Sequence, residues 1–371
     1  MSLLFDAPTP SALSLVHVEP VSDRKYWNAI VAALPGAEVE QGYEWGEVLR
    51  DTGWLPRRFA VLRGDTPVAG VSVLVRRFAG LPFPIAYAPR GPLADPEDGD
   101  AWRALDGVWR RLAVEHALVF VRASAARCVD DLAWSAALEA NGFTALPQQW
   151  TTWNLPRVVV TLDLTPSIDD LRRGLRKRIR QSVAAAQRHG VKVREAGSPE
   201  EVLQFHQLLV ETARGRYPVR PATRLLAVWR EYAERGDGVV LFAEHGGEIL
   251  GGLSGVRAGR RAAFHAMAIR RDASAPDLGQ GALLYWSFIE WAKAAGCEAL
   301  DWGGSATGYP PSPTDPGYGV YQFKRGFGCA LEYRLPYHDR VFRPGLYRGF
   351  RVLEERVLPR AWQWRARFNG F

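Results

Sequence analysis

Hydrophobic and polar positions along the chain repeat one order of elements twice. An apolar strand ending at Leu62 meets a turn at residues 63–67 and returns over 68–73. The same hairpin recurs in residues 239–253, about the turn 244–247. Each hairpin is followed by a further strand, a helix, a strand and a closing Gly-Phe pair. This repeated order predicts two copies of one small fold.

The remaining periodicity predicts the other elements. Helices are expected at 26–34, 41–52, 100–115, 131–141, 168–189, 199–214 and 278–295, and strands at 118–121, 151–164, 262–268 and 299–302. Residues 1–22 show no clear period. With 371 residues, of which 47% are hydrophobic, the chain is expected to split into two domains of ordinary size. The β-branched segment 151–164 is the expected crossing point between them.

The charge balance is basic. A net charge of +7 predicts attraction to polyanions, such as nucleic acid, anionic lipid or phosphorylated metabolites, and does not choose among them. The charge is concentrated in the expected helix 168–189, which carries Arg172, Arg173, Arg176, Lys177, Arg178, Arg180 and Arg188. Two interpretations stay open for this helix. It is either a solvated face opposite an apolar stripe, or a surface that contacts phosphates.

Several classes of protein are disfavoured. Cys128, Cys297 and Cys329 have no CxxC spacing, so neither a disulfide framework nor a zinc site is predicted. The seven histidines form no metal-ligand spacing, and no serine elbow or phosphate-binding loop motif is present. The first residues lack a basic region followed by an apolar run, and no stretch has the length needed to cross a bilayer. We therefore expect a cytoplasmic protein.

The meander, a helix that starts at Gly279-x-Gly281, and the following strand resemble the GNAT acyltransferase fold. The resemblance implies an α/β (α+β) class with two tandem GNAT-like domains, each with a mixed sheet flanked by helices. In that family, amides at the helix start bind the pyrophosphate of acyl-CoA. The alternative interpretation is that these glycines only permit a tight entry into a packed helix.

A closer resemblance is carried by motifs in a particular order. They are Gln41-x-x-x-Trp45, the loop YAPRGP at 87–92, the basic helix, Asp301-Trp302-Gly303-Gly304, and Phe323-Lys324-x-Gly326-Phe327. This order is similar to that of the FemABX family over residues 25–340. Members of that family are tandem GNAT-like enzymes that transfer an amino acid from aminoacyl-tRNA to the stem peptide of a peptidoglycan precursor. The resemblance implies domains at 23–157 plus 335–371, and at 158–334 with the basic helix.

The same resemblance implies site residues. Lys324 occupies the position of the family's functional lysine, and we predict that Lys324 and Asp301 are catalytic. A fixed cation would stabilise the oxyanion formed during aminoacyl transfer. The alternatives for Lys324 are a surface lysine or one paired with Asp301. The predicted substrate-binding residues are Trp45, Tyr87, Arg90, Arg214, Arg216, Tyr217, His265 and Phe323, and the predicted tRNA-binding residues are Arg172, Arg173, Arg176, Lys177 and Arg180.

Two of these residues carry open questions. Arg90 lies in a loop rich in proline and glycine, where it would either bind a diphosphate or carboxylate or hold the loop by bonding backbone carbonyls. His265 stands in a strand where the family often has tyrosines, and its imidazole would donate a comparable hydrogen bond. The acceptor substrate is therefore the less certain part of the resemblance.

The implied partners are aminoacyl-tRNA as co-substrate and a lipid-linked or nucleotide-linked muropeptide precursor. We predict no cofactor, no metal and no stable protein partner. The arginine-rich and aromatic segment 334–371 would either contact anionic lipid at the inner face of the membrane or return to the first domain. Two other functions remain open, namely an acyl-CoA-dependent N-acyltransferase acting on a small amine and a non-catalytic RNA-binding protein.

Overall fold

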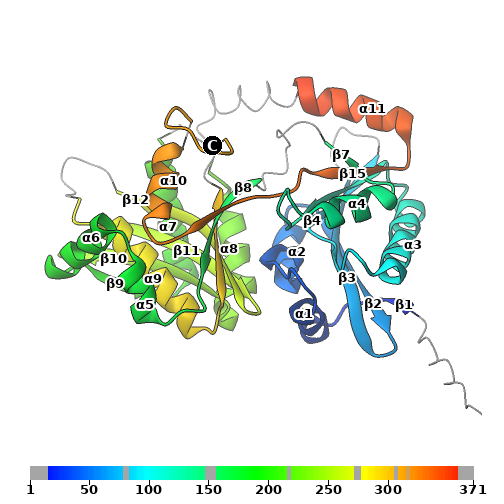
Figure 1. Ribbon diagram of the computed structural model, residues 1–371. Coiled ribbons are helices and arrows are strands. Elements are labelled where there is room, and N and C mark those ends of the chain that lie inside the picture. Colours follow the sequence, from blue (N-terminus) through cyan, green and yellow to red (C-terminus); the bar gives the residue numbers. More distant parts are fainter. Residues whose placement is uncertain are drawn as a thin grey trace, which may run out of the picture.

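Two lobes, each built around one sheet, make up the computed structural model (Figure 1). The structure describes residues 16–77, 83–146, 156–214, 219–270, 277–304, 308–315 and 317–357. In the first lobe the strands are β1 (Val16–Pro20), β2 (Leu55–Arg63), β3 (Thr66–Arg77), β4 (Pro84–Arg90), β5 (Leu93–Ala94), β6 (Phe120–Ala125), β7 (Thr144–Ala145) and β15 (His338–Val341). Its helices are α1 (Arg24–Ala33), η1 (Val39–Gln41), α2 (Tyr43–Arg50), α3 (Gly99–Glu115), α4 (Leu132–Ala140), α11 (Pro344–Val352) and η3 (Leu353–Val357).

The second lobe has the same plan. Its strands are β8 (Val158–Asp163), β9 (Lys192–Glu195), β10 (Gly238–His245), β11 (Glu248–Ala258), β12 (Arg261–Ile269), β13 (Ala299–Gly304) and β14 (Ala330–Tyr333). Its helices are α5 (Ile168–Gly174), α6 (Lys177–Arg188), α7 (Pro199–Ala213), α8 (Ala222–Glu231), η2 (Ala233–Arg235), α9 (Gln280–Ala294) and α10 (Tyr318–Arg325). The predicted fold class, with two mixed sheets flanked by helices, is therefore confirmed.

The duplication extends to the pairing of the strands. In the first lobe the meander β2–β3–β4 is antiparallel, and β6 then pairs in parallel with β4. In the second lobe the meander β10–β11–β12 is antiparallel, and β13 pairs in parallel with β12. A parallel neighbour needs a crossover, which α3 and α9 supply. The repeat seen in the sequence therefore corresponds to a repeat of the strand topology.

The first lobe is completed by a strand from beyond the second lobe. In the second sheet, β8 pairs antiparallel with β13, although it follows directly after the first lobe in the chain. In the first sheet the equivalent place beside β6 is taken by β15, which follows the second lobe. The chain therefore crosses between the lobes twice, and the second crossing is visible in Figure 1 ahead of β15. The crossings touch, since the Arg334 amide donates to the Arg157 carbonyl at 2.7 Å.

The described part of the C-terminal segment packs on the first lobe. Arg122 in β6 is fully buried and bonds the carboxylate of Asp339 in β15 at 2.7 Å and that of Glu354 in η3 at 2.5 Å. These contacts agree with the return to the first domain that was one of the two interpretations of this segment. Residues 358–371, with their aromatic side chains, lie outside the described residues.

The single helix predicted at 168–189 is wrong. The chain is extended at Leu175 and Arg176, with ψ angles of 133° and 145°, so α5 and α6 are separate helices. The break places Leu175 in the core and lets the Arg176 amide donate to the Gly326 carbonyl at 2.9 Å. Periodicity does not reveal this break because the apolar stripe continues through it. That stripe is confirmed, since Leu171, Leu175, Ile179 and Val183 are all buried.

Other differences from the sequence prediction concern elements at the edges. The strand β1 pairs with β2 and begins at Val16, ahead of the expected start of the first domain at residue 23. The helices α8 and α11 carry no strong sequence signal and were not predicted. Of the expected strand 151–164, residues 151–155 lie outside the described residues, and β8 forms the rest. No helix in the described ranges is both long and apolar enough to span a bilayer.

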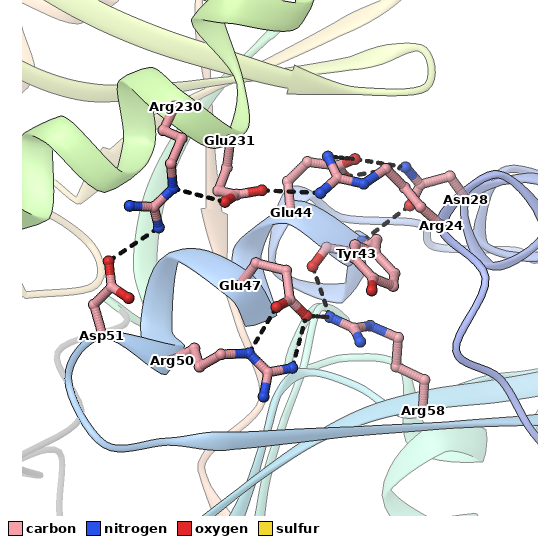
Figure 2. Close-up of polar contacts among 10 residues, drawn as sticks. All are labelled: Arg24, Asn28, Tyr43, Glu44, Glu47, Arg50, Asp51, Arg58, Arg230 and Glu231. Carbon is pink, nitrogen blue, oxygen red and sulfur yellow. Dashed lines mark hydrogen bonds and ion pairs between the residues drawn. The ribbon is translucent and has the colours of Figure 1, made fainter. Parts of the chain in front are cut away.

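The lobes meet along α2 and α8, through an apolar cluster and a polar bridge. The cluster contains Val39, Val48, Ala227, Val228, Tyr232 and Val256. Figure 2 shows the bridge: Arg24 contacts Glu44 at 3.4 Å within the first lobe and Glu231 at 2.9 Å in the second. Arg230 joins Glu231 to Asp51 across the same boundary, at 3.0 Å each. Glu231 is 8% exposed and accepts from both lobes, so it is the centre of the bridge.

We expect Glu231→Ala to lower the free energy of unfolding by about 2 kcal/mol, because it removes a buried carboxylate that two guanidinium groups share across the boundary. Urea unfolding followed by tryptophan fluorescence measures the change. Glu234→Ala, an exposed glutamate three residues away, is the matched control and should change stability by less than about 0.5 kcal/mol. Equal stability of the two variants would show that the bridge does not stabilise the lobe contact.

Candidate functional site

Lys324 belongs to α10, and its buried ammonium group lies at the end of β13. Its side chain is 3% exposed, and its ammonium group donates to the carbonyl oxygens of Trp302 at 2.7 Å and Gly304 at 2.9 Å. Of the alternatives for this residue, a surface position is excluded by the burial. An ammonium group has three donors, so two fixed bonds leave one for another acceptor. Among the described residues, two carbonyls therefore hold the Lys324 ammonium in place, and its third donor has no hydrogen-bond acceptor.

Aromatic side chains surround this lysine. The ammonium lies 5.5 Å from the centre of the Phe264 ring, and Phe264 stacks on Tyr285, which contacts Phe323 edge-on. Burial in these surroundings lowers the Lys324 pKa to about 8, against the opposing effect of Asp301. The lysine is therefore mainly charged at neutral pH but not far from titration.

The motif that carries Lys324 is fixed by α6. A Cβ atom added at Gly326 would lie 2.5 Å from Ile179, so the close approach of α6 requires glycine here. The backbone bond from Arg176 to Gly326 joins the same two segments. The basic helices are thus in direct contact with the helix of the candidate catalytic lysine.

Asp301 faces the first lobe. Its Oδ1 atom accepts the Gly303 amide at 2.6 Å, and the side chain is 8% exposed. It interacts electrostatically with Arg90 and with Glu38 and Glu40 beside η1. Asp301 therefore joins a buried cluster of charges at the boundary between the lobes.

Arg90 occupies the first-lobe side of that cluster. Its backbone is left-handed, with φ 55°, and its amide donates to the Ser124 hydroxyl at 3.0 Å. Its guanidinium donates to the Pro156 carbonyl at 3.3 Å. Burial acts to lower the Arg90 pKa, but Glu40, Asp301 and Glu38 outweigh it and raise the value. Arg90 thus bonds a backbone carbonyl, as one of its two interpretations required, and also neutralises neighbouring carboxylates.

Glu38 and Glu40 were not singled out in the sequence. Glu38 is 4% exposed and lies 2.6 Å from the Arg261 guanidinium and 3.5 Å from that of Arg334, both in or beside the second sheet. Burial raises the Glu38 pKa to about 7, although the two arginines oppose the shift. The only signal was two acids ahead of a predicted helix, which is common on solvated surfaces.

A cavity of about 410 Å³ opens beside Glu38. It is lined by both lobes: Gly36, Glu38, Ala126, Arg127, Cys128, Asp130, Asp131, Arg261, Glu332 and Arg334. Four of these residues are acids and three are arginines, so charged groups of both signs meet in one hollow. Such a lining suits a ligand that carries both an ammonium and a carboxylate group.

A second group of cations lies at the start of α8. Desolvation and, to a smaller extent, the neighbouring Arg220 lower the Arg224 pKa to about 10. The Arg224 guanidinium lies 5.0 Å from the Trp45 ring centre. His265 is close to both arginines, and desolvation together with their charge lowers its pKa to about 3. This histidine is therefore neutral near pH 7, and Arg220 and Arg224 are cations that sequence reasoning missed.

The other predicted substrate residues are placed as follows. Tyr87 is buried in the first lobe, where its hydroxyl lies 3.1 Å from the Ser124 hydroxyl, and it supports the Arg90 loop from below. Phe323 packs on the core of the second lobe beside Lys324. Arg214 ends α7 in a left-handed conformation, with φ 46°. Arg216 and Tyr217 lie outside the described residues.

The predicted tRNA-binding residues are all exposed on α5 and α6. They are Arg172, Arg173, Arg176, Lys177 and Arg180, of which Arg173 pairs with Asp170. Because α6 contacts the Lys324 motif, this basic surface borders the candidate catalytic lysine. A solvated surface and a phosphate-binding surface both remain compatible with the exposure.

The glycines at the start of α9 serve packing. Gly279 has a φ of 87°, and a Cβ atom there would overlap the Ser182 carbonyl oxygen of α6. The amides of Leu278 and Gly279 are already bonded, by Gln280 at 2.9 Å and Asp277 at 3.1 Å. This geometry matches the alternative in which the glycines permit a tight entry into the helix.

Comparison with known proteins places the chain in a family. The FemAB family model matches residues 26–221, more than half of the chain, and an acetyltransferase (GNAT) domain model matches residues 172–325. The chain therefore belongs to the FemAB family, as the order of its motifs predicted.

The relatives agree with this assignment. The crystal structure of FemX superposes with a TM-score of 0.80 at 18% identity, over 89% of this chain and 99% of that one. A tandem GNAT protein from the clavulanic acid biosynthesis pathway superposes with a TM-score of 0.51 at 13% identity, over 87% and 98%. Lipid II:glycine glycyltransferase from Staphylococcus aureus is 35% identical over 79 residues, or 21% of this chain. The chain spans only 18% of the length of that curated relative.

We expect Lys324 to titrate near pH 8, because burial among aromatic rings disfavours its charged form. NMR of protein with ¹³C at the lysine Cε follows each lysine through the titration. Lys324→Arg assigns the signal by removing it, and Lys192→Arg in the same way assigns the signal of an exposed lysine as the control. A Lys324 signal that stays unchanged up to pH 10 would contradict the burial of this ammonium group.

Proposed function

We propose that the protein transfers an amino acid from aminoacyl-tRNA to the amino group of a stem peptide in a peptidoglycan precursor. The observation that carries this proposal is Lys324, a buried ammonium group fixed on two carbonyls with one donor to spare. It lies in a lobe of GNAT fold, beside a basic surface and near the boundary with the first lobe. Membership of the FemAB family supports an acyl transfer of this kind.

This reaction requires the protein to position the two substrates and to stabilise the negative charge that forms. The acceptor amine attacks the ester carbonyl of the aminoacyl-tRNA, and a C–N bond forms as the carbonyl oxygen becomes negative. Collapse of this intermediate breaks the ester C–O bond, and the ribose hydroxyl leaves with the proton that the amine gives up. Lys324 would donate its third hydrogen bond to the negative oxygen, where a fixed charge in a dry site is most effective.

The cavity beside Glu38 offers a place for the acceptor peptide. Glu38, Asp130, Asp131 and Glu332 would attract an ammonium group, and Arg127 a carboxylate. Arg220 and Arg224, which lie near His265, add cations that suit an anionic part of the precursor. A stem peptide carries amino and carboxyl groups, and its carrier carries phosphates, so the two regions together match its chemistry.

The name of one relative favours one of the two forms of the acceptor precursor. Lipid II:glycine glycyltransferase, as its name states, acts on lipid II, and its similarity to this chain is local. By this analogy we infer a lipid-linked precursor, with nucleotide-linked precursor as the alternative. A protein using the lipid-linked form would work from the cytoplasm at the inner face of the membrane, without needing to span it.

We expect purified protein to move a radiolabelled amino acid from charged tRNA to a muropeptide precursor, and Lys324→Met to slow this transfer 100-fold to 1000-fold because the oxyanion loses its cation. Lys192→Met is the matched control, since Lys192 is exposed on β9, and should keep full activity. Unfolding curves of each variant confirm that the proteins remain folded.

A panel of charged tRNAs and of both precursor forms makes this test decisive. No transfer by folded wild-type protein across the panel would reject the proposal. Full activity of Lys324→Met would reject the role of the lysine. Tight acetyl-CoA binding in calorimetry, together with acetyl transfer to an amine, would instead favour an N-acyltransferase.

We expect Arg176→Glu with Arg180→Glu to raise the KM for aminoacyl-tRNA at least tenfold and leave the KM for the acceptor nearly unchanged, because these residues would meet phosphates. Arg103→Glu with Arg110→Glu, an equal charge change on exposed α3, is the control. Initial rates over a range of salt concentrations measure both KM values. The KM for aminoacyl-tRNA should also depend less on salt in Arg176→Glu with Arg180→Glu than in the wild type. Equal KM values for the two double variants would favour a merely solvated helix face.

A further inference from the structure

Tyr309 forms an exposed aromatic platform between β13 and the helix of Lys324. Its ring stacks on that of Tyr333, with centroids 4.8 Å apart and an interplanar angle of 11°. The Arg157 guanidinium lies over the Tyr333 ring, 4.5 Å from its centre. Tyr309 nevertheless remains 55% exposed. The Tyr309 ring is therefore supported on one face by Tyr333 and is accessible to solvent.

The loop that carries Tyr309 is organised by a side chain. The Asp315 carboxylate accepts the Gly308 amide at 3.1 Å and the Ser312 amide at 2.6 Å. Asp315 also accepts the Tyr318 amide through its own carbonyl, at the start of α10. These bonds tie the platform to the helix of Lys324, so the ring has a defined position before any ligand arrives.

The strand register places this platform beside Lys324. Tyr333 lies opposite Val158 on one side of β8, and Gly304 lies opposite Val159 on the other side. Neighbouring strands are about 4.8 Å apart, so the backbones of Tyr333 and Gly304 are about 10 Å apart. The Gly304 carbonyl accepts the Lys324 ammonium at 2.9 Å.

The side chain of Tyr333 lies on the face of the sheet that α9 and α10 cover. Leu331 in the same strand packs on the core of that face, and side chains two residues apart share a face. Tyr333, on which Tyr309 stacks, and the end of β13 that holds Lys324 therefore lie on the same face of the sheet, with backbones about one nucleotide's length apart.

We propose that Tyr309 is a stacking site for a nucleobase of the substrate, set next to Lys324. This inference rests on the proposed function for the identity of the substrate. A base has two flat faces, and each of the bases stacks on an aromatic ring. With the base on Tyr309, the sugar of the same nucleotide lies toward the Lys324 ammonium. Two sources supply such a base, namely the 3′ end of tRNA and the uridine of a nucleotide-linked precursor.

Binding of two probes distinguishes these sources without any turnover. The probes are a ribo-oligonucleotide ending in the CCA sequence of tRNA, and uridine diphosphate, each titrated by calorimetry against the full chain. We expect Tyr309→Ala to weaken one of them by about 5-fold to 150-fold, the range that loss of one stacked base gives. Tyr309→Trp should preserve the affinity, because it keeps the flat ring.

Tyr26→Ala, which removes another half-exposed tyrosine from α1, is the matched control and should bind both probes as the wild type does. A loss confined to the oligonucleotide assigns the platform to tRNA, and a loss confined to uridine diphosphate assigns it to the precursor. The proposal is overturned if Tyr309→Ala binds both probes as well as wild type, or if wild type binds neither. Failure of transfer with intact, Tyr309-dependent binding would instead reject the proposed function and leave the platform in place.

Discussion

The structure depends on one topological constraint: the strand that completes the first sheet comes after the second lobe in the chain. The first sheet is completed by β15, whereas the second lobe runs without interruption from β8 to β14. The two crossing segments are bonded to each other through Arg157 and Arg334. The apolar cluster and the ion pairs around α2 and α8 join the lobes as well, so side chains from both lobes meet along one boundary. Positioning of two substrates at one boundary is what a transfer reaction requires.

The charges at that boundary are buried because the two lobes pack together there. Asp301 and Arg261 face out of the second sheet and meet Glu38 and Arg90 from the first lobe, where they lose most of their water. Buried charges are tolerated only when they are paired, and here each carboxylate has a guanidinium in reach across the boundary. Lys324 differs, because backbone carbonyls rather than carboxylates hold it. Its positive charge is not cancelled by a direct partner among the described residues, so it remains effective toward a substrate.

The sequence predicted the repeated fold well and the site only in part. The hairpins, the long helices and the apolar stripe of α6 follow from local periodicity, which a single sequence records directly. The break at Leu175 and Arg176 was missed because a tertiary bond to Gly326 causes it and the apolar stripe continues across it. Lys324 stood out through a motif, whereas Glu38 and Arg224 become notable only when contact between the lobes desolvates them. Pairing of distant segments leaves no pattern in either segment alone.

The position of α6 links the start of α9 to the motif that carries Lys324. In the GNAT comparison, the start of α9 would receive a pyrophosphate, but α6 approaches it so closely that Gly279 has no room for a side chain. In this position α6 exposes its cations to solvent, and its Ile179 side chain packs against Gly326 in the Lys324 motif. The basic surface and the buried lysine are thus two consequences of one helix position. A substitution that moves α6 should disturb both together, whereas the interface charges around Glu38 belong to the other face of the sheet and should not change.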